Sequence, residues 1–112
     1  MKKKDVYIGI DVSKGYSDFS IVTSEKEQIE SIFQLDDSKD GHEILKEKVL
    51  ELLNKFTTVI VGVENTGGYE RNWVNTMNWL RKKNKSVHIY KLNPKAVKHQ
   101  IQTLMKTVVN DG

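Results

Sequence analysis

The strongest constraint on the fold is a short apolar run near the start of the chain that stops on an acid. Residues 6–10 are apolar or glycine, and Asp11 follows them directly, before a small polar stretch. Such a run, rich in β-branched side chains, predicts a buried strand. A carboxylate in that setting is costly to bury unless a metal ion, a hydrogen-bond donor or a cation pairs with it. We therefore expect the chain to be organised around Asp11.

The rest of the chain alternates between strand and helix patterns. The predicted elements after the first strand are a hairpin strand at 17–22, a strand at 28–35, a helix ending near 55, a strand at 57–64, a helix from about 73, a strand at 86–92 and a helix from 93. This order predicts an α/β fold. In it, an antiparallel three-strand meander is followed by parallel strands in one mixed sheet, with helices flanking the sheet.

The strand at 57–64 is nearly all β-branched and also ends on a carboxylate, Glu64. If this strand and the first strand are parallel neighbours, Asp11 and Glu64 converge at one edge of the sheet. Carboxylates arranged in this way bind Mg²⁺ or Mn²⁺ through hard oxygen ligands. Two such ions, about 3.5–4 Å apart, stabilise the attacking and leaving oxygens of phosphodiester transfer. The alternative for each acid is a strand-end residue that faces water.

Length and composition exclude several classes of protein. A chain of 112 residues suits one domain with one core. It has no cysteine, which excludes a disulfide framework and thiolate chemistry. No apolar run approaches the length that spans a membrane, and the start does not read as a signal peptide. We expect a cytoplasmic protein that does not bind membranes.

The charge is distributed unevenly along the chain. Residues 1–64 hold 9 Lys or Arg and 13 Asp or Glu, whereas residues 65–112 hold 9 Lys or Arg and 2 acids. A basic half beside an acidic half favours a polyanionic partner. A solvated lysine-rich surface would give the same pattern, so charge alone leaves both interpretations open.

Three segments together carry a family resemblance. They are Gly-Ile-Asp-Val-Ser-Lys at 9–14, Glu-Asn-Thr-Gly-Gly-Tyr at 64–69 and Asn-Pro-Lys-Ala-Val-Lys at 93–98. In this order and spacing the chain resembles the N-terminal domain of the DEDD transposases, insertion-sequence recombinases related to the Piv invertases. The Glu-x-Thr-Gly-x-Tyr element is the most specific part. The resemblance implies a RuvC-like, ribonuclease-H-like fold.

The resemblance also implies which acids are catalytic. Asp11 and Glu64 are similar to the first two acids of the family's set, and Asp111 to the third, so these three residues would be both catalytic and metal-binding. The fourth acid would fall just past Gly112. By this resemblance, residues 1–112 are expected to be a catalytic-domain fragment that ends before the last acid, lacks the C-terminal domain and is inactive alone.

The activity implied by the resemblance is DNA transposition or site-specific recombination. It would consist of metal-dependent phosphodiester cleavage and strand transfer on DNA, with Mg²⁺ or Mn²⁺ as the cofactor. The implied partners are DNA, a structured guide RNA and, in the full-length protein, further copies of the chain.

Nucleic-acid contacts are expected at the two turns and along the last helix. The candidates are Ser13, Lys14, Thr66, Gly67, Tyr69, Lys95, Lys98 and Lys106. Glycine lets a nucleic-acid backbone approach closely, and lysine contacts phosphates. The turn residues also suit plain turn-forming or packing roles, and each lysine alone also suits a solvated surface.

Two other classes of function remain open from the sequence. An actin-like phosphotransferase also begins with a Gly-x-Asp strand and a hairpin, although residues 12–15 lack the second glycine expected directly after the acid. A non-catalytic nucleic-acid-binding module would use the basic half and leave the acids incidental.

Overall fold

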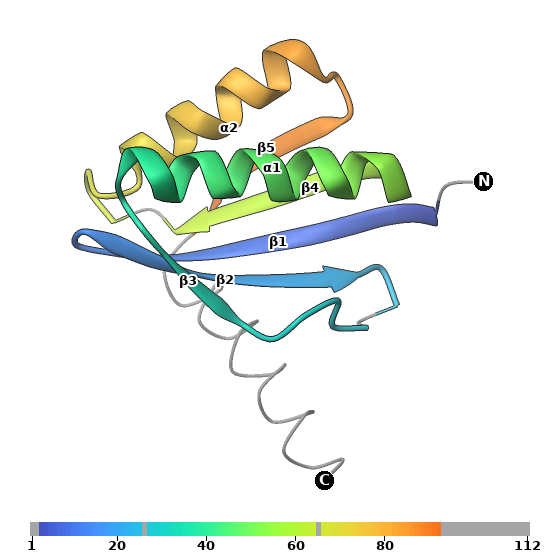
Figure 1. Cartoon of the computed structure of the whole chain (residues 1–112), viewed down its shortest axis with the longest axis horizontal. Helices are drawn as coiled ribbons and strands as arrows, with labels where there is room; N and C mark the ends of the chain where they lie inside the picture. Colours follow the sequence, from blue (N-terminus) through green and yellow to red (C-terminus); the bar gives the residue numbers. More distant parts are fainter. Residues whose placement is uncertain (1–2, 26, 65, 93–112) are drawn as a thin grey trace, which may run out of the picture.

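The computed structural model describes residues 3–25, 27–64 and 66–92 of the chain. In these ranges a single mixed sheet carries two helices on the same face (Figure 1). The strands are β1 (Lys3–Ser13), β2 (Tyr16–Thr23), β3 (Phe33–Asp36), β4 (Phe56–Glu64) and β5 (Val87–Leu92). The helices are α1 (Lys39–Lys55) and α2 (Arg71–Lys83).

The strand order across the sheet is β3-β2-β1-β4-β5. The first three strands form an antiparallel meander, and β4 and β5 lie parallel to β1, each reached through a helix. This arrangement confirms the predicted α/β, ribonuclease-H-like fold class. It also makes β1 and β4 direct neighbours in the middle of the sheet; β4 ends on Glu64, whereas β1 continues two residues past Asp11 to Ser13.

The third strand is shorter than the sequence pattern predicts. The alternation at 28–35 suggested one continuous strand, but β3 covers Phe33–Asp36, and Gln28 reaches the sheet only through a bridge to Val22. Phe19 pairs with Phe33, so a regular ladder would pair Val22 with residue 30 rather than with Gln28. The two extra residues interrupt the ladder, and alternation alone cannot reveal such a register shift. The helix predicted from 93 lies outside the described residues.

The start of α1 is held tightly against the end of β3. Ser38 is the N-cap residue, and its side-chain oxygen accepts a hydrogen bond of 3.2 Å from the Gly41 backbone N–H. A Cβ atom on Gly41 would lie 1.8 Å from the Asp36 carbonyl oxygen. Only glycine therefore lets the helix begin this close to the strand. From here Leu45, Val49 and Leu52 form the buried stripe of α1.

The core lies between the sheet and the two helices. Alternate residues of β1, from Val6 to Val12, point into it, as do Val59, Val61 and Val63 of β4. The Phe19 ring packs edge-on against Trp73 of α2 at 5.2 Å between ring centroids. Because side chains alternate along a strand, residues between these apolar positions point to the opposite face of the sheet.

Candidate active site

Asp11 and Glu64 lie side by side at the carboxyl ends of two neighbouring parallel strands. β1 and β4 pair in register up to Ile10 and Val63, and each acid is the next residue of its strand. Ile10 and Val63 belong to the core, so alternation turns both acids to the opposite face of the sheet. Adjacent strands are about 4.8 Å apart, which brings both carboxylates within reach of one cation.

The two acids differ in their exposure to solvent. Glu64 is 2% exposed, whereas Asp11 is partly exposed. Burial of an ionised carboxylate carries a desolvation cost that a nearby cation offsets. The pair therefore offers one interior oxygen ligand and one that a substrate in solution can reach.

A third acid, Asp18, lies on β2 directly beside Asp11 of β1. The hairpin register pairs Asp11 with Asp18, and Asp18 in turn pairs with Gln34 of β3. The Gln34 side-chain amide donates a hydrogen bond of 3.2 Å to the Asp18 carboxylate. The sequence patterns alone do not single out Asp18. The pairing of Asp18 with Asp11 could have been predicted, because a two-residue turn at Lys14 and Gly15 fixes which residues of β1 and β2 lie opposite each other.

The donors brought together at this edge are carboxylate oxygens, which suit Mg²⁺ or Mn²⁺ rather than thiolate-binding metals. Within residues 3–25, 27–64 and 66–92, no group of three or more His, Cys, Asp or Glu side chains is placed to hold a metal ion. Asp111, the third predicted ligand, lies outside the described residues, as do Lys95, Lys98 and Lys106. The metal centre therefore stays a prediction that the donor chemistry fits.

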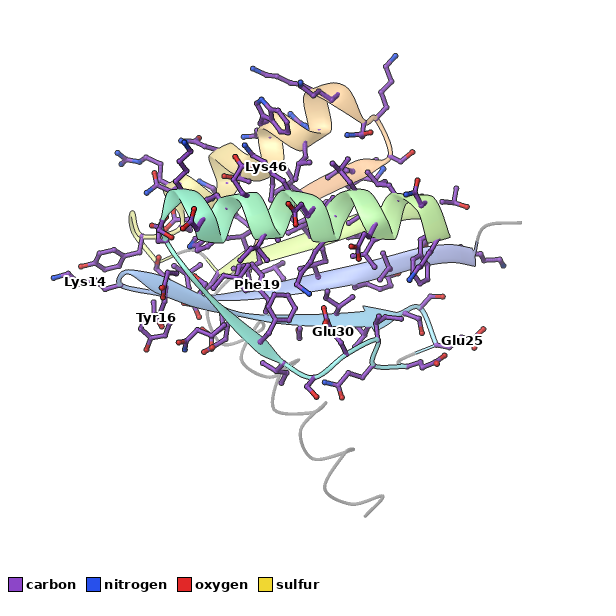
Figure 2. All side chains as sticks on the ribbon, viewed as in Figure 1. Lys14, Tyr16, Phe19, Glu25, Glu30 and Lys46 are labelled. Atoms are coloured by element: carbon purple, nitrogen blue, oxygen red, sulfur yellow. The ribbon has the colours of Figure 1, made fainter. Side chains whose placement is uncertain are left out.

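The hairpin turn lies at the same end of the sheet as the acids. Ser13 pairs with Tyr16 across the turn, and Lys14 is exposed at its tip. Figure 2 shows Lys14 and Tyr16 at one end of the molecule and Glu25 at the other. Ser13 and Lys14 remain candidates for contacting a phosphate near Asp11.

The turn after β4 is built around Glu70, a residue that the sequence patterns do not single out. Gly67 and Gly68 have positive φ angles of 78° and 144°. Thr66 donates to the Glu70 carboxylate through both its backbone N–H and its hydroxyl, at 3.1 and 2.9 Å. Thr66 is thus occupied within the protein, whereas Tyr69 is 53% exposed and Gly67 is exposed.

The hydrogen bonds at this turn keep Glu70 ionised. Burial alone would raise the pKa of Glu70, but hydrogen bonds from the backbone of Gly68, from its own backbone and from Thr66 lower its pKa from 4.5 to about 2. Glu70 is 6% exposed. A buried negative charge therefore lies directly behind the turn that follows Glu64.

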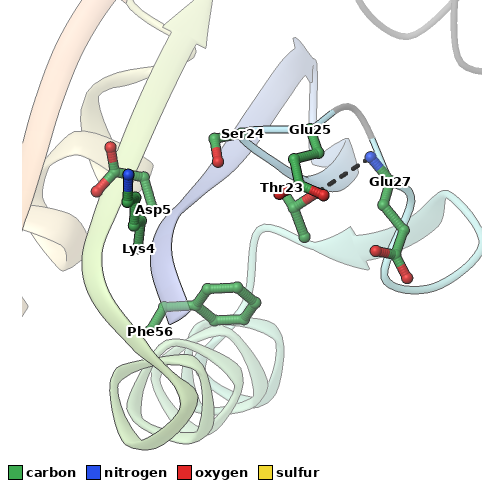
Figure 3. Close-up of a pocket in the computed structure, with 7 residues that line it drawn as sticks. All are labelled: Lys4, Asp5, Thr23, Ser24, Glu25, Glu27 and Phe56. Atoms are coloured by element: carbon green, nitrogen blue, oxygen red, sulfur yellow. Dashed lines mark hydrogen bonds between the residues drawn. The ribbon is translucent and has the colours of Figure 1, made fainter. Parts of the chain in front are cut away.

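A pocket lies at the other end of the strands from Asp11 and Glu64, where β1 and β4 begin (Figure 3). Its lining residues are Lys4, Asp5, Thr23, Ser24, Glu25, Glu27 and Phe56. The Glu27 backbone N–H donates to the Thr23 hydroxyl at 3.1 Å and shapes one wall. Since it lies at the amino ends of β1 and β4, this pocket is separate from the acid pair.

The sheet order, with acids at the carboxyl-terminal parts of the parallel neighbours β1 and β4, defines a ribonuclease-H-like domain of the RuvC type. The model of the DEDD transposases of the IS110 type, described as "Transposase", matches residues 8–107. The chain belongs to this transposase family. Among curated proteins no match is found.

Two solved structures share the fold. One is T. thermophilus RuvC in complex with a Holliday junction substrate, with a TM-score of 0.56, 19% sequence identity, and coverage of 84% of this chain and 68% of that one. The other is the fowlpox virus Holliday junction resolvase, with a TM-score of 0.51, 12% identity, and coverage of 79% and 61%. In the described part of the chain, neither helix is both long and apolar enough to cross a membrane.

Proposed function

We propose that this domain performs metal-dependent phosphodiester cleavage and strand transfer on DNA during transposition. The observation that carries the proposal is the register of β1 and β4, which puts Asp11 next to Glu64 on one face of the sheet. Membership of a transposase family and a fold shared with a resolvase bound to a Holliday junction support DNA as the substrate.

In this proposal Asp11 and Glu64 hold the cation, and Asp111 completes the ligand set as the family resemblance implies. Bound Mg²⁺ or Mn²⁺ would supply charge stabilisation for the attacking and leaving oxygens of the phosphodiester. Glu64 would fix the position of the site from the interior, and the partly exposed Asp11 would face the DNA. Lys14, at the tip of the neighbouring turn, would contact a flanking phosphate.

The partners follow from the same resemblance. A structured guide RNA and further copies of the chain are proposed for the full-length protein, alongside DNA. Since the chain belongs to a transposase family, the actin-like phosphotransferase is no longer a competing candidate.

The test is metal binding, followed residue by residue. We expect Mg²⁺ or Mn²⁺ titration of the ¹⁵N-labelled chain to perturb the amides of Asp11, Glu64 and residues 66–68, and Asp11→Asn to weaken the response at least tenfold. Asp5→Asn is the matched control, because Asp5 lies on the same strand and face but at the other end. An unchanged response in Asp11→Asn would refute the proposal.

The remaining alternative is a non-catalytic nucleic-acid-binding module. One observation favours it: α2 carries Arg71, Arg81, Lys82 and Lys83 and no acid. In the full-length protein, a recombination rate unaffected by Asp11→Ala and Glu64→Ala would favour this module over the catalytic domain.

A further inference from the structure

The turn between β4 and α2 directs two backbone N–H groups, those of Thr66 and Gly68, at a single point. Gly67 and Gly68 both have positive φ angles, and the Arg71 N–H donates to the Gly68 carbonyl at 3.1 Å. Turns of this kind direct successive backbone N–H groups into one concavity, where they bind phosphates and carboxylates. Such a concavity next to a proposed phosphodiester site would ordinarily be assigned to the substrate.

In this protein the concavity is filled from within. One oxygen of Glu70, Oε1, accepts hydrogen bonds from the Thr66 N–H at 3.1 Å, the Thr66 hydroxyl at 2.9 Å and the Gly68 N–H at 2.9 Å. The other oxygen, Oε2, lies 4.0 Å from the Lys91 ammonium on β5. The carboxylate thus occupies the place of a bound anion.

Glu70 does not act as an ordinary helix cap. It is the N-cap residue of α2, but its side chain makes no capping hydrogen bond to the helix. An N-cap side chain normally accepts from the second or third helical N–H group. The Glu70 carboxylate points back to the turn instead, so its three hydrogen bonds stabilise the segment that begins two residues after Glu64.

We propose that residues 66–68 form an anion site whose resident anion is the Glu70 carboxylate, which keeps phosphate out of the turn and holds in place the chain that follows Glu64. Glu70 is thus a positioning residue. Its consequence for catalysis rests on the proposed function, whereas the anion site itself does not.

The outer side of the turn is open with respect to the described residues. Apart from the chain neighbours of each glycine, no atom of residues 3–25, 27–64 and 66–92 lies within 4 Å of a Cβ atom built on Gly67 or Gly68. A DNA backbone can therefore pass over the glycines, while the hydrogen-bond donors beneath them are already used. Phosphate contacts near the acids would then come from side chains such as Lys14 rather than from this turn.

The test removes the Glu70 carboxylate by substitution and then adds a small anion that could take its place. In metal-free buffer we expect acetate or inorganic phosphate to shift the Thr66 and Gly68 amide resonances of Glu70→Ala in a saturable way, and to leave those of the wild-type chain unchanged. Glu43→Ala is the control, because Glu43 is an exposed acid on α1. Equal shifts in the wild-type chain, or a folded Glu70→Ala that binds neither anion, would overturn the proposal.

A second measurement covers a variant that folds poorly. If Glu70→Ala folds but is too unstable for the amide titration, acetate should raise its thermal midpoint well above that in chloride of equal ionic strength, and equal midpoints in the two salts would contradict the anion site. Glu70→Gln keeps the shape of the side chain but loses its charge. We expect it to fold and to bind Mn²⁺ several-fold more weakly than the wild-type chain, whereas unchanged Mn²⁺ binding would refute the positioning role.

The two proposals can fail separately. Anion titration without metal tests only the turn and Glu70, whereas metal titration of the wild-type chain tests only the acid pair. If the wild-type chain does not bind Mn²⁺ and the Glu70→Ala variant binds acetate, the proposed function is refuted and the anion site is supported.

Discussion

Asp11 and Asp18 face each other across the β1–β2 hairpin. This like-charge pair is the main residue-level feature of the end of the sheet where Asp11 and Glu64 lie. Directly opposed like charges destabilise a sheet, and the Gln34 amide relieves only one of the two carboxylates. A cation held by Asp11 would remove the repulsion. Under the proposed function, the pair would link the stability of the hairpin to metal binding.

The first prediction concerns this pair. Asp18→Asn should raise the free energy of unfolding in EDTA by roughly 0.2–1 kcal/mol, because the repulsion is removed. It should also reduce the extra stability that Mg²⁺ confers, since the metal would have less repulsion to relieve. Urea unfolding with and without Mg²⁺ measures both effects. Glu47→Gln, which removes the charge of an exposed acid in the middle of α1, is the control. A destabilised Asp18→Asn in EDTA would contradict the argument.

The second prediction is the pH dependence that Glu70 contributes. The pKa of Glu70 is lowered from 4.5 to about 2 in the folded chain, so the ionised form stabilises the fold above pH 4.5. This contribution should decline as the pH falls from 4.5 and be lost near 2. Unfolding of the wild-type chain and of Glu70→Gln, compared across this range, should show a stability difference that shrinks with acid. A difference that stays constant down to pH 2 would refute it.

At the scale of elements, α1 is tied to the sheet at its first turn and to α2 near its start. The third prediction uses the first of these contacts. Alanine usually favours a helix over glycine, yet Gly41→Ala should destabilise the chain by about 1–3 kcal/mol, because the new Cβ atom collides with the Asp36 carbonyl oxygen. Thermal unfolding measures the destabilisation. Asn54→Ala, on the exposed side of the same helix, should be neutral or stabilising.

His42 links the two helices through a chain of short hydrogen bonds. Its Nε2 lies 2.6 Å from the Asp37 carboxylate and its Nδ1 lies 2.6 Å from the Thr76 hydroxyl. Since a carboxylate only accepts, neutral His42 carries its proton on Nε2, and Nδ1 accepts from Thr76. The imidazole also stacks on Trp73 at 4.1 Å, which places this link against the core.

The fourth prediction tests that link. Thr76→Val keeps the shape of the side chain but removes the donor, and should lower the free energy of unfolding by roughly 1 kcal/mol. Chemical unfolding measures the change, and Asn75→Ala on the exposed face of α2 is the control. If the two variants are equally stable, the link contributes little and packing alone holds the helices together.

At the scale of the whole molecule, positive charge gathers at the C-terminal end of α2, away from Asp11 and Glu64. Arg81, Lys82 and Lys83 lie in its last turn, about 20 Å along the helix axis from its start near Glu64. The Trp79 ring, 42% exposed, has Lys46 and Lys83 each 4.3 Å from its centroid. The negative face of the ring attracts both ammonium groups and so gathers positive charge around Trp79.

The fifth prediction follows from this charge distribution. If this end of α2 lies against a DNA backbone, Lys82→Ala combined with Lys83→Ala should weaken duplex binding. The slope of log K against log salt should become shallower by about 0.9 for each phosphate that the variant no longer neutralises. Fluorescence anisotropy over a salt series measures the slope. Lys55→Ala, at the end of α1, is the control. An unchanged slope would exclude this end of α2 from the DNA interface.

The sequence alone located β1, β2, β4, β5, the two described helices and the acids Asp11 and Glu64, but not the bounds of β3. Periodicity located β1, β4 and the helices because burial selects apolar residues at the spacing of each element. The same patterns placed Asp11 and Glu64 at strand ends, and the family resemblance was confirmed by the match over residues 8–107.

Only the tertiary structure decided which groups meet. The pairing of Asp11 with Asp18, the interrupted ladder before β3 and the use of Thr66 by Glu70 all depend on register and on turn geometry. These are relations between residues whose local patterns are equally compatible with other partners. A strand pattern specifies which face a side chain occupies, whereas the neighbour it finds on that face is set by how the strands align.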